Sequence, residues 1–203
     1  MKKVVLSLLI AYLLGSINPA AIVAKFKKKN LREEGTKNLG ATNTMMVMGK
    51  KWGALVMAFD IAKAYLAVKI AELLVPATAA VAMASGFFAI VGHCFPFHMK
   101  FKGGKGLAAF GGVVLAYSPG LFLFLLSTAV ILILIVNYSF IMPFYASVAF
   151  PLHVALHTDS VVAVLFAFAA SLLIFVKHFG NFKKACRGED VKVREYIRTK
   201  LFH

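Results

Sequence analysis

Residues 93–106 read His-Cys-Phe-Pro-Phe-His-Met-Lys-Phe-Lys-Gly-Gly-Lys-Gly and form the most basic, glycine-rich interruption of a very apolar chain. Because glycine lacks a Cβ, the backbone at Gly103, Gly104 and Gly106 can turn sharply and direct successive N–H groups at one spot. Such a nest binds an anion, and a helix that begins just downstream adds the partial positive charge of its N-terminus. The stretch therefore predicts a phosphate-binding loop; the alternative is a flexible basic loop between two membrane helices.

The composition around this stretch is that of a membrane protein. The chain has 203 residues, of which 61% are hydrophobic and only 15% charged, and its mean hydropathy is +0.82. A soluble domain is nearer half apolar and a quarter charged. The sequence therefore predicts an all-α, polytopic membrane protein. Residues 1–203 have room for six or seven spans of about 20 residues, so we expect one integral membrane domain.

The net charge of +15 is unevenly distributed along the chain. Of the 23 Lys and Arg residues, 19 lie in three clusters, Lys25–Lys51, Lys100–Lys105 and Lys177–Lys200. Each cluster lies between or after apolar runs, as the preference of basic residues for the cytoplasmic side predicts. This pattern indicates a lipid bilayer as a partner, and we expect no nucleic acid. The remaining positive charge fits either anionic lipid headgroups or an anionic substrate. Two cysteines are too few for a zinc site, so we expect free thiols and no metal.

The apolar runs predict seven membrane helices, at 1–24, 52–74, 77–92, 106–117, 121–136, 140–156 and 161–176. We expect the first helix to be uncleaved, although it resembles a signal peptide, and to be kinked near Gly15, Ser16 and Pro19. The polar blocks follow the first, third and seventh helices, so they lie on one side. Their positive charge makes that side the cytoplasm, with the N-terminus outside and the C-terminus cytoplasmic. The three blocks can therefore converge on one site where an anionic substrate meets an apolar one.

Four polar side chains in the first block are candidates for this site. Thr36, Asn38, Thr42 and Asn43 carry hydroxyls and amides that form hydrogen bonds. This density exceeds what a simple connection needs; the alternative is helix capping and turn formation.

Other candidates lie in and beside the apolar runs. Asp60 and Lys63 are three residues apart on one helix face, which predicts an ion pair or, alternatively, the lining of a site. His93 and His178 are candidate imidazoles, with structural hydrogen bonds as the alternative. The chain has no Gly-x-Ser-x-Gly nucleophile pattern and no His followed four residues later by Asp. These features favour catalysis by positioning and electrostatic stabilisation.

Together these residues resemble the PlsY family of acyl-phosphate:glycerol-3-phosphate acyltransferases of bacteria. The resemblance covers nearly the whole chain and is most specific in the second motif, Gly92-His93-x-Phe95-Pro96-x-x-x-x-Phe101-Lys102-Gly103-Gly104-Lys105-Gly106. The other matching parts are Gly15-Ser16-Ile17, Gly35–Asn43 with Gly49-Lys50, Asp60 with Lys63, and His178-x-x-Asn181 followed by Gly188-Glu189.

The resemblance implies seven helices with the active site at the cytoplasmic face of a bacterial plasma membrane. It implies transfer of a fatty acyl group from acyl phosphate to the sn-1 hydroxyl of glycerol 3-phosphate, which gives lysophosphatidate and phosphate without a cofactor. The implied catalytic residues are His178, Asn181 and Lys105. The implied substrate- and phosphate-binding residues are Thr36, Asn38, Gly40, Thr42, Asn43, His93, Lys102, Gly103, Gly104 and Gly106.

The chain departs from the family pattern at several positions. Thr36 stands where the family usually has Ser, which keeps the hydroxyl. Met46 stands near the usual Arg, and the loss of a guanidinium is not conservative. Asn137-Tyr138-Ser139 only partly represents the family's Arg-Tyr-x-Ser-Leu loop, and Phe179-Gly180 replaces a common Arg-Glu. The departures leave open an altered substrate, a weak enzyme, a non-catalytic paralogue, or a transporter or scaffold that binds a phosphate-bearing molecule.

Overall fold

The computed structural model of the protein describes residues 1–190, 192–195 and 198, and the regular secondary structure of these residues is helical throughout. The far end of the predicted basic tail lies outside the described residues. The elements are α1 (Lys2–Ser16), α2 (Pro19–Phe26), α3 (Ala41–Met48), α4 (Lys50–Leu74), α5 (Ala79–Cys94), the short 3₁₀ helix η1 (Phe97–Met99), α6 (Leu107–Tyr117), α7 (Pro119–Val136), α8 (Ile141–His157) and α9 (Val161–Cys186).

Proline and short polar side chains set several helix boundaries. The first predicted helix is in fact broken: α1 ends at Ser16, and α2 begins at Pro19. The Asn18 side chain accepts a hydrogen bond from the Ala21 N–H at 2.8 Å, a typical N-cap, and proline fits the first helical position because it needs no donor there. Ser118 caps α7 in the same way, again with proline following.

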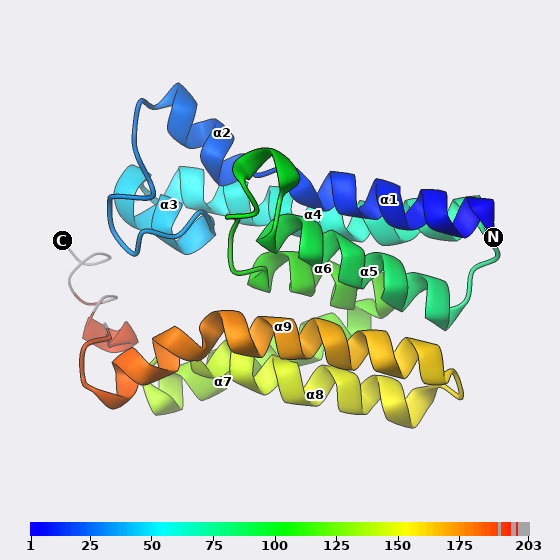
Figure 1. The fold of residues 1–203 in the computed structure, drawn as a ribbon. Helices are drawn as coiled ribbons and strands as arrows, with labels where there is room; N and C mark the ends of the chain where they lie inside the picture. Colours follow the sequence, from blue (N-terminus) through cyan, green and yellow to red (C-terminus); the bar gives the residue numbers. More distant parts are fainter. Residues whose placement is uncertain (191, 196–197, 199–203) are drawn as a thin grey trace.

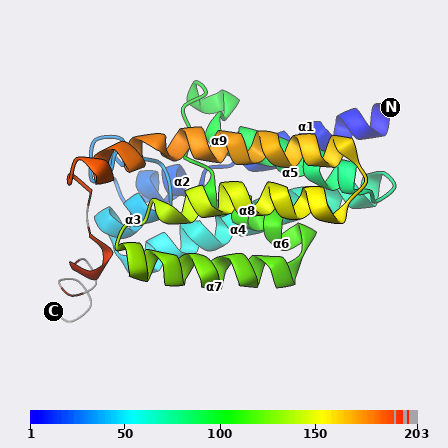
Figure 2. The ribbon, with the colours of Figure 1, turned by 90° about the horizontal axis from the view of Figure 1, so that it is seen from below.

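The long helices lie side by side in two layers. Helices α1, α4, α5 and α6 form one layer, and α7, α8 and α9 form the other, with α8 between α7 and α9 (Figures 1 and 2). The layers meet where α5 packs against α9 and α6 against α7. Helices α2 and α3, the loop that contains η1, and the end of α9 lie toward the end of the bundle opposite the N-terminus (Figure 1).

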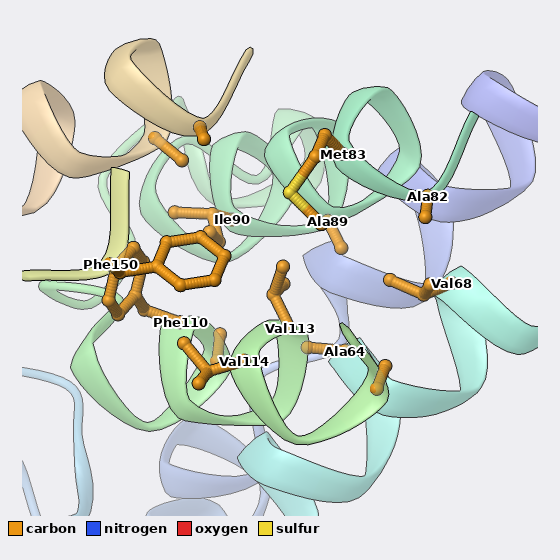
Figure 3. Close-up of a cluster of buried hydrophobic side chains, with 14 of the residues drawn as sticks. Ala64, Val68, Ala82, Met83, Ala89, Ile90, Phe110, Val113, Val114 and Phe150 are labelled. Carbon is orange, nitrogen blue, oxygen red and sulfur yellow. The ribbon is translucent and has the colours of Figure 1, made fainter. Parts of the chain in front are cut away.

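Small apolar residues allow these helices to approach closely. Ala64 and Val68 of α4, and Ala89 of α5, are fully buried beside Val113 of α6 (Figure 3). Alanine-rich contacts of this kind are typical of helices that associate in membranes, where van der Waals contact replaces the hydrophobic effect.

Among the described residues, four helical segments are long and apolar enough to cross a bilayer: Lys2–Phe26, Ala79–Met99, Pro119–Val136 and Val161–Cys186. Helix α4 is as long but carries Asp60, Lys63 and other charges, and α6 and α8 are shorter apolar helices. At 11 residues, α6 is only about 16 Å long, about half the thickness of the hydrocarbon core. The all-helical prediction is confirmed, whereas seven spans and the orientation of the termini remain predictions.

Candidate active site

The loop between α5 and α6 brings the three polar blocks together. Arg32 of the first block donates a hydrogen bond from Nη2 to the carbonyl oxygen of Lys102 at 2.6 Å. On the other side, Lys105 Nζ donates to the side-chain oxygen Oδ1 of Asn181 on α9. The predicted convergence of the three blocks is therefore found in the structure.

Two of the loop glycines use their N–H groups to fold the loop itself. The Gly103 N–H donates to the Cys94 carbonyl, and the Gly104 N–H to the His93 carbonyl, both at 3.1 Å. The expectation that these N–H groups point at a bound anion is therefore wrong for Gly103 and Gly104. Their donors are already engaged, and both residues shape the site from within the loop.

Donors for an anion begin one residue later, where α6 starts. Gly106 precedes α6 with a φ of 86°, a left-handed conformation that glycine adopts at no steric cost. The first N–H groups of a helix have no intrahelical partner, and the helix dipole places partial positive charge there. The side chain of Lys105 adds a full positive charge at the same helix end. The start of α6 therefore combines unpaired N–H donors, the helix dipole and a lysine ammonium, a combination that can bind an anion.

Lys105 is half-buried between this helix end and α9. Burial, followed by the repulsion of Lys184, lowers the pKa of the Lys105 ammonium, and the negative charge of Asp190 opposes the shift. The ammonium keeps donors beyond the one it gives to Asn181. It is therefore a point charge that a phosphate oxygen can approach from the α6 side.

His178 is held in one tautomer on the same helix as Asn181. Its Nδ1 lies 2.9 Å from the carbonyl oxygen of Ile174, so Nδ1 carries the proton and Nε2 is left as an acceptor. Its spacing of three residues from Asn181 puts the two side chains on one face of α9. His178 is only 5% exposed. This arrangement can accept a hydrogen bond from a substrate hydroxyl and orient it.

The predicted residues of the first block divide into an exposed and a buried group. Thr36 and Thr42 are exposed, and Asn38 is half-buried. Gly40 is buried and caps α3, and Asn43 is fully buried.

The comparisons with known proteins identify the family. The family model described as glycerol-3-phosphate acyltransferase matches residues 5–188. The chain belongs to this family. A curated relative named glycerol-3-phosphate acyltransferase, from Coxiella burnetii strain Dugway 5J108-111, is 39% identical over 193 residues, covering 94% of this chain and 98% of the relative. The protein of that name from Thermoanaerobacter pseudethanolicus is 36% identical over 197 residues, covering 97% and 98% of the two chains.

Solved structures of the family member PlsY resemble the present one closely. The glycerol 3-phosphate form of PlsY, an integral membrane glycerol 3-phosphate acyltransferase, matches with a TM-score of 0.87 and 31% identity, covering 93% of this chain and 94% of that one. The lysophosphatidic acid form matches with a TM-score of 0.84 and 30% identity over the same shares.

Two of the departures from the family pattern, Met46 and Asn137, lie in different surroundings. Met46 is 43% exposed on α3. Asn137 ends α7 with a φ of 66° and binds the C-terminal segment. Its carbonyl accepts from the Val193 N–H at 3.0 Å, and its Oδ1 accepts from the Arg194 N–H at 2.8 Å. The loop after α7 is therefore an anchor for the chain that follows α9.

Sequence reasoning missed three residues that fix the family's second motif in place. Arg32 holds the Lys102 carbonyl as described above. Tyr12 of α1 donates its hydroxyl to the Phe95 carbonyl at 2.9 Å, and Lys177 of α9 lies 4.4 Å from the centre of the Phe95 ring. These contacts join residues far apart in the chain, and no local pattern signals them.

Within the described part of the chain, no group of three or more His, Cys, Asp or Glu residues could hold a metal ion.

The buried Asn43 side chain binds the backbone of the segment that precedes α3. Its Oδ1 accepts from the Thr36 N–H at 2.6 Å, while its Nδ2 donates to the carbonyls of Leu31 and Glu34 at 3.0 and 3.1 Å. These three bonds use both the oxygen and the nitrogen of the Asn43 amide, and all three partners precede Asn43 in the sequence. Asn43 therefore organises residues 31–36, which carry Arg32 to the active-site loop.

Replacement of Asn43 should destabilise the protein before it affects substrate affinity. We expect Asn43→Ala to lower the free energy of unfolding by about 2–3 kcal/mol, because buried polar partners lose their hydrogen bonds. Asn43→Asp should cost more, since a carboxylate would face two carbonyl oxygens. Thermal unfolding in detergent measures both variants, with Asn38→Ala as the half-buried control. A KM increase with unchanged stability would instead indicate that Asn43 binds substrate directly.

Proposed function

We propose that this protein transfers a fatty acyl group from acyl phosphate to the sn-1 hydroxyl of glycerol 3-phosphate, giving lysophosphatidate and phosphate for phospholipid synthesis. The observation that carries the proposal is the meeting of a lysine-bearing helix N-terminus with His178 and Asn181 in a chain of this family. The second motif and α9 supply both halves of that arrangement.

The chemistry requires little from the protein beyond positioning. Acyl phosphate is a mixed anhydride with a good leaving group. The sn-1 hydroxyl oxygen of glycerol 3-phosphate attacks the acyl carbonyl carbon, and the bond from this carbon to the phosphate oxygen breaks. The proton of the sn-1 hydroxyl passes to a phosphate oxygen. Lys105 and the start of α6 stabilise the phosphate charge, and electrostatic stabilisation of this kind is a large catalytic contribution. His178 and Asn181 orient the reacting groups.

We assign the remaining residues by their positions. Thr36, Asn38 and Thr42 line the substrate-binding side, and the buried Gly40 caps α3 beside them. The exposed Lys102 adds a water-screened positive charge and makes no contact with substrate in this proposal. In this proposal His93, Gly103, Gly104 and Asn43 shape the site from behind, and Gly106 begins the phosphate-binding helix end.

The proposed setting is a bacterial plasma membrane. Residues 1–203 form one domain that crosses the bilayer seven times, with the N-terminus outside and the C-terminus cytoplasmic. The basic clusters support a cytoplasmic active site, because Lys and Arg concentrate on that side. The acyl chain would lie among the apolar helices, so the activated carbonyl reaches the site at the membrane surface.

The test is acyl transfer by the purified protein. Radiolabelled glycerol 3-phosphate is supplied with palmitoyl phosphate, palmitoyl-CoA or palmitoyl-acyl carrier protein in parallel reactions. We expect labelled lysophosphatidate from palmitoyl phosphate alone. Product from another donor would refute the donor assignment. No product with any donor, from protein with a cooperative unfolding transition, would favour a non-catalytic paralogue that binds a phosphate-bearing molecule.

The lowered pKa of Lys105 predicts the alkaline side of the pH profile. As pH rises through this lowered pKa, the ammonium loses its charge, so kcat/KM should fall at a pH below that expected for an ordinary lysine. Lys105→Arg should extend the plateau to higher pH, because arginine stays charged. For stability the sign is opposite: burial of the charged form costs stability at low pH, and this cost is relieved as pH rises through the lowered pKa. Initial rates at low substrate concentration measure the profile.

A further inference from the structure

A buried charge network lies directly behind the active-site loop. Lys63 Nζ of α4 is 2.7 Å from Asp60 Oδ1, and His93 Nδ1 of α5 is 3.2 Å from the same oxygen. Lys63 Nζ is also 3.0 Å from His93 Nδ1. The three residues are 1–3% exposed. This confirms the predicted ion pair and shows that His93, predicted to bind substrate, has its ring turned into the protein.

A network of this kind is an unusual feature for a helix packed among apolar helices. Removing two charges from water costs several kcal/mol per ion, and apolar residues of similar volume are often as stabilising. Ionisable residues at membrane depth are expensive and commonly serve function. The Lys63 ammonium also donates to the Ile17 carbonyl at 2.5 Å, in the break between α1 and α2. The network therefore joins three separate parts of the fold at one point.

His93 connects the charge network to the loop between α5 and α6. Its carbonyl accepts the Gly104 N–H at 3.1 Å. Its ring lies so close to the Gly104 backbone that a Cβ at residue 104 would overlap Nε2. The next residue is Lys105, which binds Asn181 and begins the approach to α6. The position of the Lys105 ammonium therefore depends on where the His93 ring and carbonyl lie.

We propose that Asp60 and Lys63 are positioning residues for the phosphate-binding loop. They fix the His93 ring from behind, and His93 sets the path of Gly104 and Lys105. Neither Asp60 nor Lys63 touches substrate in this proposal. The inference rests on the proposed function only for the identity of the anion, because phosphate binding can be measured without turnover.

The same helix offers a matched control. Lys69 and Glu72 also form an ion pair with a spacing of three residues, at 2.9 Å, toward the other end of α4. This pair is partly exposed, and the Lys69 ammonium lies 5.9 Å from the centre of the Tyr65 ring on the same helix. A double neutral replacement is suitable for each pair, because removing one partner of a buried pair leaves an uncompensated charge and can prevent folding. The variants are Asp60→Asn with Lys63→Met, and Lys69→Met with Glu72→Gln.

The first readout is the rise in unfolding temperature that inorganic phosphate produces in purified protein. We expect phosphate to raise the unfolding temperature of the wild type and of the Lys69/Glu72 variant. The phosphate affinity derived from this rise should be at least tenfold lower for the Asp60/Lys63 variant than for the wild type. The second readout is kinetic: KM for glycerol 3-phosphate should rise about 10- to 100-fold in the Asp60/Lys63 variant, as for misplaced binding groups.

The outcomes separate the inference from the proposed function. If the wild type turns over but the folded Asp60/Lys63 variant keeps wild-type phosphate affinity and KM, the inference is overturned and the proposed function stands. Should the Asp60/Lys63 variant fail to fold, Lys63→Arg and Asp60→Glu provide the comparison, since both keep the charges but move His93. Unchanged phosphate affinity in both of those variants would also overturn the inference. If the wild type binds phosphate without turnover, the proposed function fails while the positioning role is still tested by binding.

Discussion

Lys105→Ala is expected to lower kcat/KM for acyl transfer by about 10²–10³, the loss typical of removing one preorganised donor from developing charge. The lysine is half-buried between the start of α6 and Asn181, so its charge is held in one place and is less screened by water than that of an exposed lysine. Its removal also leaves the Asn181 side chain free to rotate. Both effects act on the transition state, so kcat should fall together with the affinity for phosphate-bearing substrate. Initial rates at varied glycerol 3-phosphate measure the two parameters.

Lys102→Ala is the matched control for this change. Lys102 lies three residues earlier and is exposed. Its backbone makes two bonds: the carbonyl accepts from Arg32, and the N–H donates to the Met99 carbonyl. We expect a rate within about threefold of the wild type, since an exposed charge is screened by water and salt. Equal losses in the two variants would mean that general positive charge, and not the position of Lys105, determines activity.

The sequence predicted the helices well because their boundaries are set by local chemistry. Ser118 and Pro119 end one helix and begin the next, as their capping and ring geometry dictate. The structure differs from the prediction in three places. The first predicted helix is broken into α1 and α2, α3 forms inside the first polar block, and the last helix is longer than predicted. It was predicted to end at residue 176, where the charges begin, but α9 continues to Cys186. Lys183 and Lys184 lie in its last turn, where positive charge is favoured by the helix dipole, so the charges extend the helix instead of ending it.

The sequence predicted which segments meet at the candidate site, but it did not predict the direction in which several of their polar groups point. Because the polar blocks follow the first, third and seventh predicted helices, the sequence placed His178, Asn181 and the glycine-lysine loop on one side of the membrane. The direction in which a side chain or N–H points depends on contacts between distant segments. Asn43 therefore looked like a substrate ligand, although it bonds the preceding loop. His93 looked similar, although Asp60 draws its ring inward.

Gly104→Ala should abolish measurable acyl transfer, a loss of at least about 10²-fold, although it adds a single methyl group. A Cβ at this position would overlap the Nε2 of His93 and approach the Leu39 carbonyl. Neither neighbour can yield easily: the His93 ring is held by Asp60 and Lys63, and the carbonyl belongs to a buried backbone segment. The loop itself must therefore move. A displacement of about 1 Å at a binding group can cost 10²-fold in rate.

Gly180→Ala separates this steric effect from the general effect of replacing a glycine at the site. Gly180 immediately precedes Asn181 on α9, yet a Cβ there meets no atom within 4 Å. Because alanine also favours a helix over glycine by about 1 kcal/mol, this variant should keep its activity and unfold at a slightly higher temperature. Initial rates and unfolding temperatures of both variants decide the matter. An active Gly104→Ala enzyme would show that the loop can shift away from His93 and still bind phosphate. The position of His93 would then not determine the geometry of the phosphate-binding loop.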